Sequence, residues 1–125
     1  MNSIKKALAG NYPARNNPVG GCPLTAALAA IGGKWKMIIV YWLSESPKHF
    51  AALRAAIPGI SQKVLTQQLR ELMADGIVSR QPKGTVPAPV EYSLSEYGRS
   101  VLPLVEEVRV WGNKHLRRTI TSSSR

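Results

Sequence analysis

The sequence predicts a mainly helical domain with one small β-hairpin, and three observations lead to this. Apolar residues recur at helical spacing in several segments that are separated by glycine and proline. A short segment near residue 90 alternates apolar and polar residues, as a half-buried strand does. The 125 residues, 44% of them hydrophobic, suffice for one domain with a hydrophobic core. We therefore expect a folded domain at 22–116, between a flexible basic extension at 1–21 and a basic serine- and arginine-rich tail at 117–125.

The first ordered element should be a short helix. Proline lacks an N–H and suits the first turn of a helix, so this helix should begin at Pro23 and end at Gly32 and Gly33. The apolar run 37–43 follows. Its periodicity does not distinguish a buried strand from a buried helix, but no comparable strand lies nearby to pair with it, and we favour a helix.

Two more helices should follow, joined by a tight turn. The spacing of Phe50, Leu53 and Ile57 predicts a short amphipathic helix that ends before the turn at 58–60. The segment 60–77 comes next, and its leucines recur on one face of a second helix.

The helix expected within 60–77 is the most two-sided segment of the chain. Ser61 is placed to cap its start, and Gly76 to end it. The face opposite the leucines is entirely polar and consists of Gln62, Lys63, Thr66, Gln67 and Arg70. These amides, hydroxyl and cations are the groups that DNA bases and phosphates require, so we interpret the segment as a recognition helix.

A hairpin should follow the recognition helix. Residues 77–80 predict a brief strand, and 90–94 predict a second one. The loop 81–89 contains Pro82 and two further prolines, which cannot donate to a sheet, so the tip should stand away from the strands. Two helices joined by a tight turn and followed by such a hairpin make a winged helix-turn-helix.

The last helix should open at 95–98 and continue to about Leu116, with its beginning weakened by Gly98 and Pro103. Its apolar stripe is longer than the small domain can cover. A second copy of the chain is the economical partner, which predicts a homodimer formed through the terminal helices. The residues expected in this contact are Val101, Leu104, Val105, Val108 and Trp111.

The charge of the chain favours an anionic partner, but its placement limits the argument. Seventeen lysines and arginines against seven acids give +10. Six of these ten charges lie in the expected extension and tail, since 1–21 and 117–125 each hold three cations and no acid. The prediction of DNA binding therefore depends on where the polar groups lie.

Several motifs resemble the HxlR-type winged-helix transcriptional regulators, which are relatives of the MarR group. The resemblance covers about 22–115 and implies a dimeric DNA-binding regulator in which 34–43 is a helix. Its motifs are Cys22-Pro23, Ile31-Gly32-Gly33-Lys34-Trp35, Phe50 with Leu53-Arg54, Ile57-Pro58-Gly59-Ile60-Ser61, Leu65-Thr66-Gln67-Gln68-Leu69-Arg70-Glu71-Leu72, Asp75-Gly76, Val90-Glu91-Tyr92-Ser93-Leu94 and Gly98-Arg99. The chain departs from the family at Pro89, where a basic residue is common, and at Ala51-Ala52, where an acidic one is common.

The candidate DNA contacts differ in what they would touch. Lys63 and Arg70 suit phosphates or guanine, whereas the two glutamines and the threonine suit adenine or thymine edges. Ser61 is expected to offer a phosphate its hydroxyl or the helix amides, although capping alone also explains this serine. On the wing, Arg80 and Lys83 would contact the backbone or minor groove. The alternative to DNA contact is that the polar face of the helix and the tip of the hairpin are simply exposed to solvent.

Cys22 is a candidate sensor. A thiol at a helix N-terminus has its thiolate stabilised by the helix dipole, and the resemblance implies redox or electrophile sensing by a cysteine in this region. With a single cysteine, sensing would need a bridge between subunits, a small-molecule adduct or a sulfenic acid. The alternative is that this small residue is only packing.

Other classes have less support. His49 and His115 lie far apart without a ligand pattern, so we expect no metal, no cofactor and no enzyme activity. We expect Trp35, Trp42 and Tyr92 in the core. No segment is long and apolar enough for a membrane and the start lacks a signal peptide, so we expect a cytoplasmic protein without a membrane partner. Two alternatives to a DNA-binding regulator remain: a thiol-based sensor and a winged-helix protein-interaction module. In each of them DNA binding would be secondary.

Overall fold

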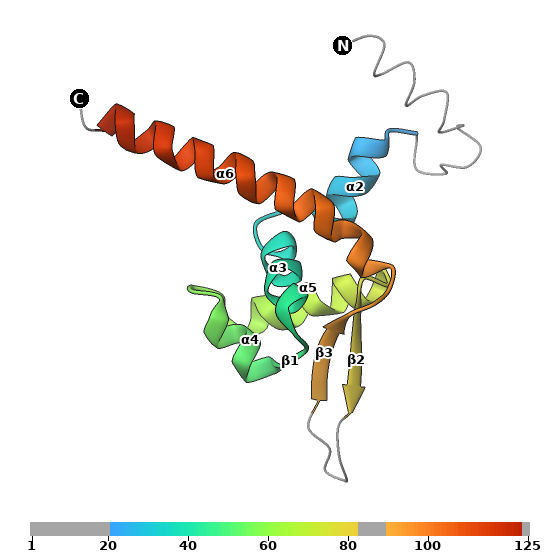
Figure 1. The fold of residues 1–125 in the computed structure, drawn as a ribbon. Helices are drawn as coiled ribbons and strands as arrows, with labels where there is room; N and C mark the ends of the chain where they lie inside the picture. The colour runs from blue at the N-terminus through green and yellow to red at the C-terminus, as the bar shows by residue number, and fades with distance from the viewer. Residues whose placement is uncertain (1–20, 83–89, 124–125) are drawn as a thin grey trace. The chain divides into compact units, whose positions relative to one another are not determined.

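The computed structural model describes residues 21–82 and 90–123, with the side chains of 121–123 left out (Figure 1). The described residues fall into two units that divide between Gly33 and Lys34. The first unit contains helix α2 (Pro23–Ile31), which has Cys22 as its extended N-cap residue and Pro23 in its first turn. It ends where the N–H of Gly32 donates to the carbonyl of Leu28 at 2.8 Å, as the glycines predict.

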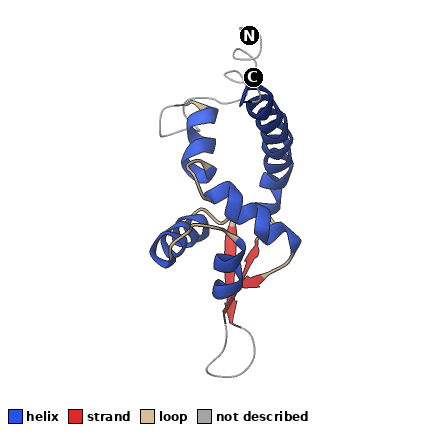
Figure 2. Cartoon of the chain, turned by 90° about the vertical axis from the view of Figure 1, so that its left-hand side faces the viewer, coloured by secondary structure: helices blue, strands red, loops and turns tan. Residues whose placement is uncertain are grey.

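The second unit combines helices with one small sheet (Figure 2). Its elements are α3 (Lys36–Glu45), β1 (Lys48–His49), α4 (Phe50–Ala56), α5 (Gln62–Ala74), β2 (Val78–Pro82), β3 (Val90–Leu94), the 3-10 helix η2 (Gly98–Val101) and α6 (Leu102–Ser123). The prediction that 37–43 lies in a buried helix is confirmed. Helix α3 contacts α4, β3, η2 and α6, and its residues Ile39, Val40 and Leu43 are almost completely buried. It is therefore the central helix of this unit.

The sheet has three antiparallel strands in the order β1-β3-β2. Strand β3 pairs with β2 from Val78 opposite Leu94 to Pro82 opposite Val90. On its other edge β3 pairs with β1, and Lys48 lies opposite Tyr92. The predicted hairpin is confirmed. Strand β1 is not predicted from the sequence, because two residues carry no strand pattern and their partner is distant in sequence.

The expected extent of the first hairpin strand is wrong, because β2 covers Val78–Pro82 instead of ending at Arg80. Strand β2 lies at the edge of the sheet, where a proline without an N–H is tolerated. The predicted separation of the hairpin tip concerns residues 83–89, which lie outside the described residues, as does most of the predicted extension at 1–21.

The last helix begins and ends differently from the expectation. Its opening is anchored by Ser95, whose Oγ accepts from the N–H of Gly98 at 2.8 Å, and the first turn is the 3-10 helix η2. Helix α6 then continues to Ser123, so the predicted end at about Leu116 is wrong. Residues 117–123 contain no glycine or proline to stop it. None of the described helices is by itself long and apolar enough to cross a membrane.

Candidate nucleic-acid interface

Helix α5 is held by its apolar face. Leu65, Leu69 and Leu72 are at most 1% exposed. At the N-terminus, the Oγ of Ser61 accepts from the backbone N–H of Val64 at 3.1 Å, which satisfies one of the amides that the helix cannot pair. Gly76, at φ +74°, follows the helix, in a conformation that favours glycine. The predicted cap and stop are both confirmed, and the opposite face of α5 is left to solvent.

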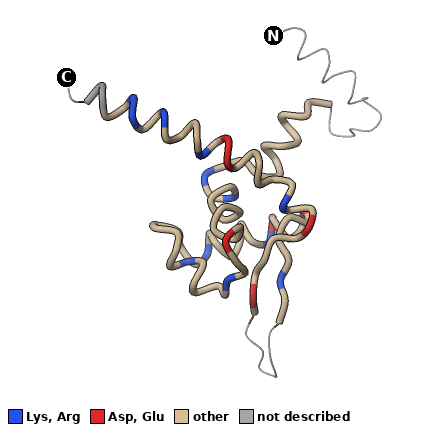
Figure 3. Tube along the Cα trace, in the orientation of Figure 1, with Lys and Arg blue, Asp and Glu red and all other residues tan. Residues whose placement is uncertain are grey.

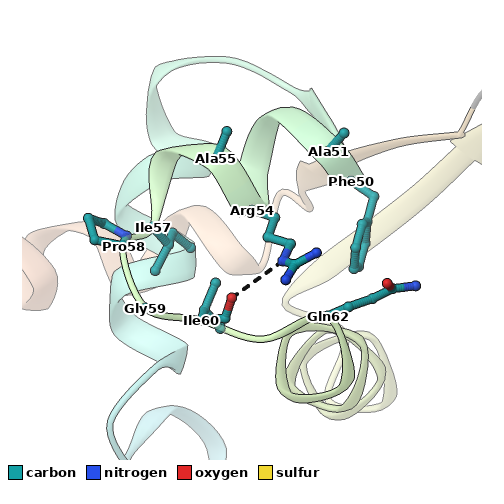
Figure 4. Close-up of a pocket in the computed structure, with 9 residues that line it drawn as sticks. All are labelled: Phe50, Ala51, Arg54, Ala55, Ile57, Pro58, Gly59, Ile60 and Gln62. Carbon is teal, nitrogen blue, oxygen red and sulfur yellow. Dashed lines mark hydrogen bonds between the residues drawn. The ribbon is translucent and has the colours of Figure 1, made fainter.

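The turn between α4 and α5 fixes where α5 begins. Ile57 and Ile60 are buried on either side of it, and Gly59 adopts φ +83°. Figure 4 shows Arg54 directed from α4 toward this turn, where its Nε donates to the carbonyl of Ile60 at 3.4 Å. A hollow of about 550 Å³ lies here between α4 and the first residue of α5, Gln62.

The predicted contact residues of α5 gather on one surface. A hollow of about 500 Å³ is lined by the whole predicted polar face, that is by Gln62, Lys63, Thr66, Gln67 and Arg70. A neighbouring hollow of about 330 Å³ is shared by α5 and the sheet, and it brings Arg80 of β2 and Tyr92 of β3 beside Thr66 and Arg70. The two hollows share Thr66 and Arg70, so the polar face of α5 adjoins the hairpin strands on one connected surface. Lys83 lies outside the described residues.

A charged cluster behind this surface is not evident from the sequence. Lys36 of α3 is buried, with its Nζ 2.7 Å from Oε1 of Glu71 on α5. The other carboxylate oxygen, Oε2, accepts from Nε2 of Gln67 at 2.9 Å. These hydrogen bonds, first from Lys36 and then from Gln67, and the positive charge of Lys36 hold the pKa of Glu71 below its usual value. The acid on this helix is therefore ionised and paired at neutral pH.

The remaining predicted sites are more scattered. Cys22 is exposed at the N-cap of α2. His49 donates from Nδ1 to the carbonyl of Val90 at 2.9 Å, so it helps to fasten β1 to β3. In the described part of the chain no group of three His, Cys, Asp or Glu is close enough to hold a metal ion. Three aromatic residues expected in the core are half-buried: Trp35, Trp42 and Tyr92.

Several apolar side chains of helix α6 are exposed in the single chain. Leu104 and Val108 are each 44% exposed and Trp111 is 64% exposed, while Val101 is half-buried. Val105 is only 7% exposed, since it packs into the core of the chain itself, and it has little area left for a contact with a second chain. An apolar groove of about 210 Å³ between α3 and α6 is lined by Met37, Ile38, Tyr41, Val105, Val108 and Arg109. The cations of α6 follow its two acids toward the C-terminus (Figure 3).

A short helix, a tight turn, a second helix with an exposed polar face and an antiparallel hairpin define a winged helix-turn-helix domain. Residues 30–120 match the HxlR-like helix-turn-helix family, and the chain belongs to this family. It is 47% identical over 95 residues to the uncharacterized HTH-type transcriptional regulator YybR of Bacillus subtilis, covering 76% of each chain.

Solved structures of a redox regulator, HypR, are also similar. The oxidized form is 47% identical with a TM-score of 0.71, and the match covers 74% of this chain and 96% of HypR. The reduced form is 44% identical with a TM-score of 0.74, and the match covers 81% of this chain and 99% of HypR. The fold, the family and these relatives together identify the chain as a transcriptional regulator, as the resemblance predicts.

Proposed function

We propose that this regulator is a homodimer that binds a pseudo-palindromic operator, with α5 of each subunit in the major groove. One observation carries the proposal, namely that the five polar residues of α5 line a single exposed hollow while the leucines of the same helix are buried. An α-helix fits the major groove, where each base pair presents a distinct pattern of donors and acceptors.

The contacts divide by chemistry. Lys63 and Arg70 would meet phosphates or guanine, while Gln62, Thr66 and Gln67 would read bases. Arg80 adjoins Arg70 and Thr66, so the wing would follow the backbone next to the same groove, and Lys83 would extend this contact. Ser61 would bring the amides of the helix N-terminus toward a phosphate.

The dimer would form through α6. Support comes from the exposed Leu104, Val108 and Trp111, of which Val108 also lines the apolar groove beside α3. Apolar area of this kind is a common mark of a protein contact. A two-fold dimer would place the two α5 helices about 34 Å apart, which is one turn of DNA, so the operator should contain two inverted half-sites.

The test is to select bound sequences from a random DNA pool and to titrate the enriched sequence and a scrambled one at several salt concentrations. We expect a preference for the enriched sequence and an affinity that falls as salt rises, because phosphate contacts release counterions. The double substitution Gln67→Ala with Arg70→Ala should remove the preference. Asn113→Ala with Arg118→Ala removes one amide and one cation from α6 and should keep it. Binding without sequence preference would contradict the proposal and favour a protein-interaction module.

We also propose that Cys22 makes DNA binding responsive to oxidants or electrophiles. Its thiol is exposed at a helix N-terminus, where the dipole favours the thiolate, and a relative with 47% identity is a redox regulator. With a peroxide, the thiolate sulfur attacks one oxygen, the O–O bond breaks, and cysteine is oxidised to sulfenic acid as the peroxide is reduced to water or alcohol. That product can condense with Cys22 of the second subunit, forming a disulfide and releasing water.

The corresponding test compares operator affinity before and after peroxide or quinone treatment. The wild-type protein should change its affinity, and Cys22→Ser should keep its affinity unchanged. A response that persists in Cys22→Ser would show that the cysteine is not the sensor. A thiol sensor with secondary DNA binding would instead show modification of Cys22 and no operator preference in either state.

A further inference from the structure

One chain of polar contacts connects the core helix α3 with the exposed face of α5. Nζ of Lys36 lies 2.7 Å from Oε1 of Glu71, and Nε2 of Gln67 donates to Oε2 of the same carboxylate at 2.9 Å. The Lys36 side chain is only 9% exposed, whereas Gln67 is exposed and lines the outer hollow of α5. Each oxygen of Glu71 thus has its own partner, one in the core and one on the surface proposed to face DNA.

The chemistry of the carboxylate decides which way the Gln67 amide lies. An ionised carboxylate only accepts hydrogen bonds, so the NH₂ group of Gln67 must face Glu71, and the amide oxygen cannot. A glutamate is ionised at neutral pH at its ordinary pKa, and the hydrogen bonds from Lys36 and Gln67 lower the pKa of Glu71 further. Oε1 of Gln67 and its second amide N–H remain available for another partner.

We infer that Lys36 and Glu71 hold Gln67 as a reader of adenine. In the major groove adenine presents the N6 amino donor beside the N7 acceptor, and a glutamine amide with Oε1 and one N–H available matches both. The inference rests on the proposed function, because it requires α5 to lie in the major groove. Lys36 is a positioning residue here, since it is buried and acts on the base only through Glu71 and Gln67.

A purely structural role for Lys36 makes a different prediction. If the lysine only neutralised Glu71, its loss would expose one negative charge near the DNA backbone and weaken binding to all sequences by a similar factor. A positioning role additionally ties one base preference to the lysine. The base preference at the position read by Gln67 is therefore the readout that separates the two roles.

The experiment is selection from a random DNA pool with the wild type, Gln67→Ala, Lys36→Met and the control Lys48→Met. The control also removes one partly buried lysine cation, but Lys48 pairs with Glu45 on α3 at 3.8 Å and not with α5. The wild type should prefer adenine at one position of each half-site by about tenfold, as one two-bond base contact supplies. Gln67→Ala and Lys36→Met should both lose this preference, and Lys48→Met should keep it.

Two results would overturn the inference while leaving DNA binding intact. One is an adenine preference that Gln67→Ala loses and Lys36→Met retains, and the other is an operator with no adenine position that depends on Gln67. A wild type that shows no sequence preference at all would instead contradict the proposed function itself, and the inference with it.

A measurement on the wild type keeps the inference testable even where Lys36→Met fails to fold. In the protein without DNA, the side-chain amide protons of Gln67 can be compared by NMR with those of Gln62, which is exposed on the same face. One Gln67 proton should lie downfield and exchange with water more slowly than those of Gln62, because it is bonded to Glu71. Equal shifts and exchange rates for the two amides would overturn the proposed orientation.

Discussion

Nζ of Lys36 and Oε1 of Glu71 lie 2.7 Å apart, which joins the central helix α3 to helix α5 through an ion pair. The pair gives the buried ammonium a charged partner and cancels the one acid within α5. Desolvating a cation without a partner is costly, so the buried Lys36 requires Glu71 to stay in place. Lys36 itself lies outside the surface that we propose for DNA contact. The stability of the fold and the shape of the proposed DNA-contact surface should therefore depend on the same ion pair.

The ion pair of Lys36 and Glu71 should make the free energy of unfolding depend on pH in the acidic range. The pKa of Glu71 is lowered from 4.5 by the hydrogen bonds from Lys36 and Gln67 and by the charge of Lys36. A carboxyl with a lower pKa in the folded state stabilises the fold above its unfolded pKa, and this contribution is lost as the pH falls through the folded pKa. The free energy of unfolding should therefore fall below pH 4.5 more steeply in the wild type than in Glu71→Gln.

Urea denaturation from neutral pH to below the ordinary carboxylate range measures this difference. Comparing the two proteins removes the contribution of other acids, including Glu106, whose pKa is lowered mainly by the hydrogen bond from Arg109. Parallel curves for the wild type and Glu71→Gln over the whole acid range would contradict the expected role of the pair.

The cap of α5 gives a second prediction. Ser61→Ala removes the oxygen that accepts from the N–H of Val64 and should destabilise the protein by about 1 kcal/mol. Ser61→Asn supplies another acceptor at the cap and should stay near wild-type stability. Thermal and urea unfolding measure both variants. If Ser61→Ala weakens operator binding while its stability is unchanged, then the serine serves the phosphate and its role as a cap is minor.

The third prediction concerns Gly98, where the surrounding backbone leaves no room for a side chain. A Cβ added at this residue would lie 2.0 Å from the carbonyl oxygen of Ile77, and backbone atoms on both sides would have to move. Gly98→Ala should therefore cost about 1–3 kcal/mol, the range for overpacking a buried site. Gly112→Ala is the matched control, because a Cβ there meets nothing within 4 Å in the protomer. Alanine in a helix is favoured over glycine by about 1 kcal/mol, so the control should be as stable as the wild type or more so.

The sequence predicts most of the fold because its signals are local. The alternating pattern at 90–94 predicts β3, and the leucine spacing with Ser61 and Gly76 predicts α5 with its cap and stop. The missed features depend on partners that are distant in sequence. Strand β1 exists only because Lys48 and His49 pair with β3, and the burial of Lys36 is possible only because Glu71 reaches it from another helix.

The candidate site is predictable to a similar extent. Helical spacing alone places Gln62, Thr66 and Arg70 on one face, and the structure gathers them in one hollow. The same spacing places Val105 in the apolar stripe of α6, but it does not reveal that the core of the protomer already covers this residue. An apolar stripe predicts that its residues are buried, but it does not show which of them pack within the chain and which are left for a contact with another chain.

The exposed part of that stripe leads to the last prediction. Trp111→Glu places a carboxylate on a surface where Trp111 is 64% exposed in the protomer, so the variant should fold and yet lose the contact between subunits. Analytical ultracentrifugation should find a dimer for the wild type and a monomer for Trp111→Glu. Asn113→Glu adds the same charge at an exposed residue of α6 outside the apolar set and should remain dimeric.

The same variants connect the dimer with DNA recognition. A dimer gains from two half-sites because the second contact becomes intramolecular. Trp111→Glu should therefore bind a full operator little better than a single half-site, whereas Asn113→Glu should keep the wild-type advantage of the full operator. A dimeric Trp111→Glu would exclude this part of α6 from the subunit contact, and a wild-type monomer that prefers a single half-site would contradict the proposed assembly.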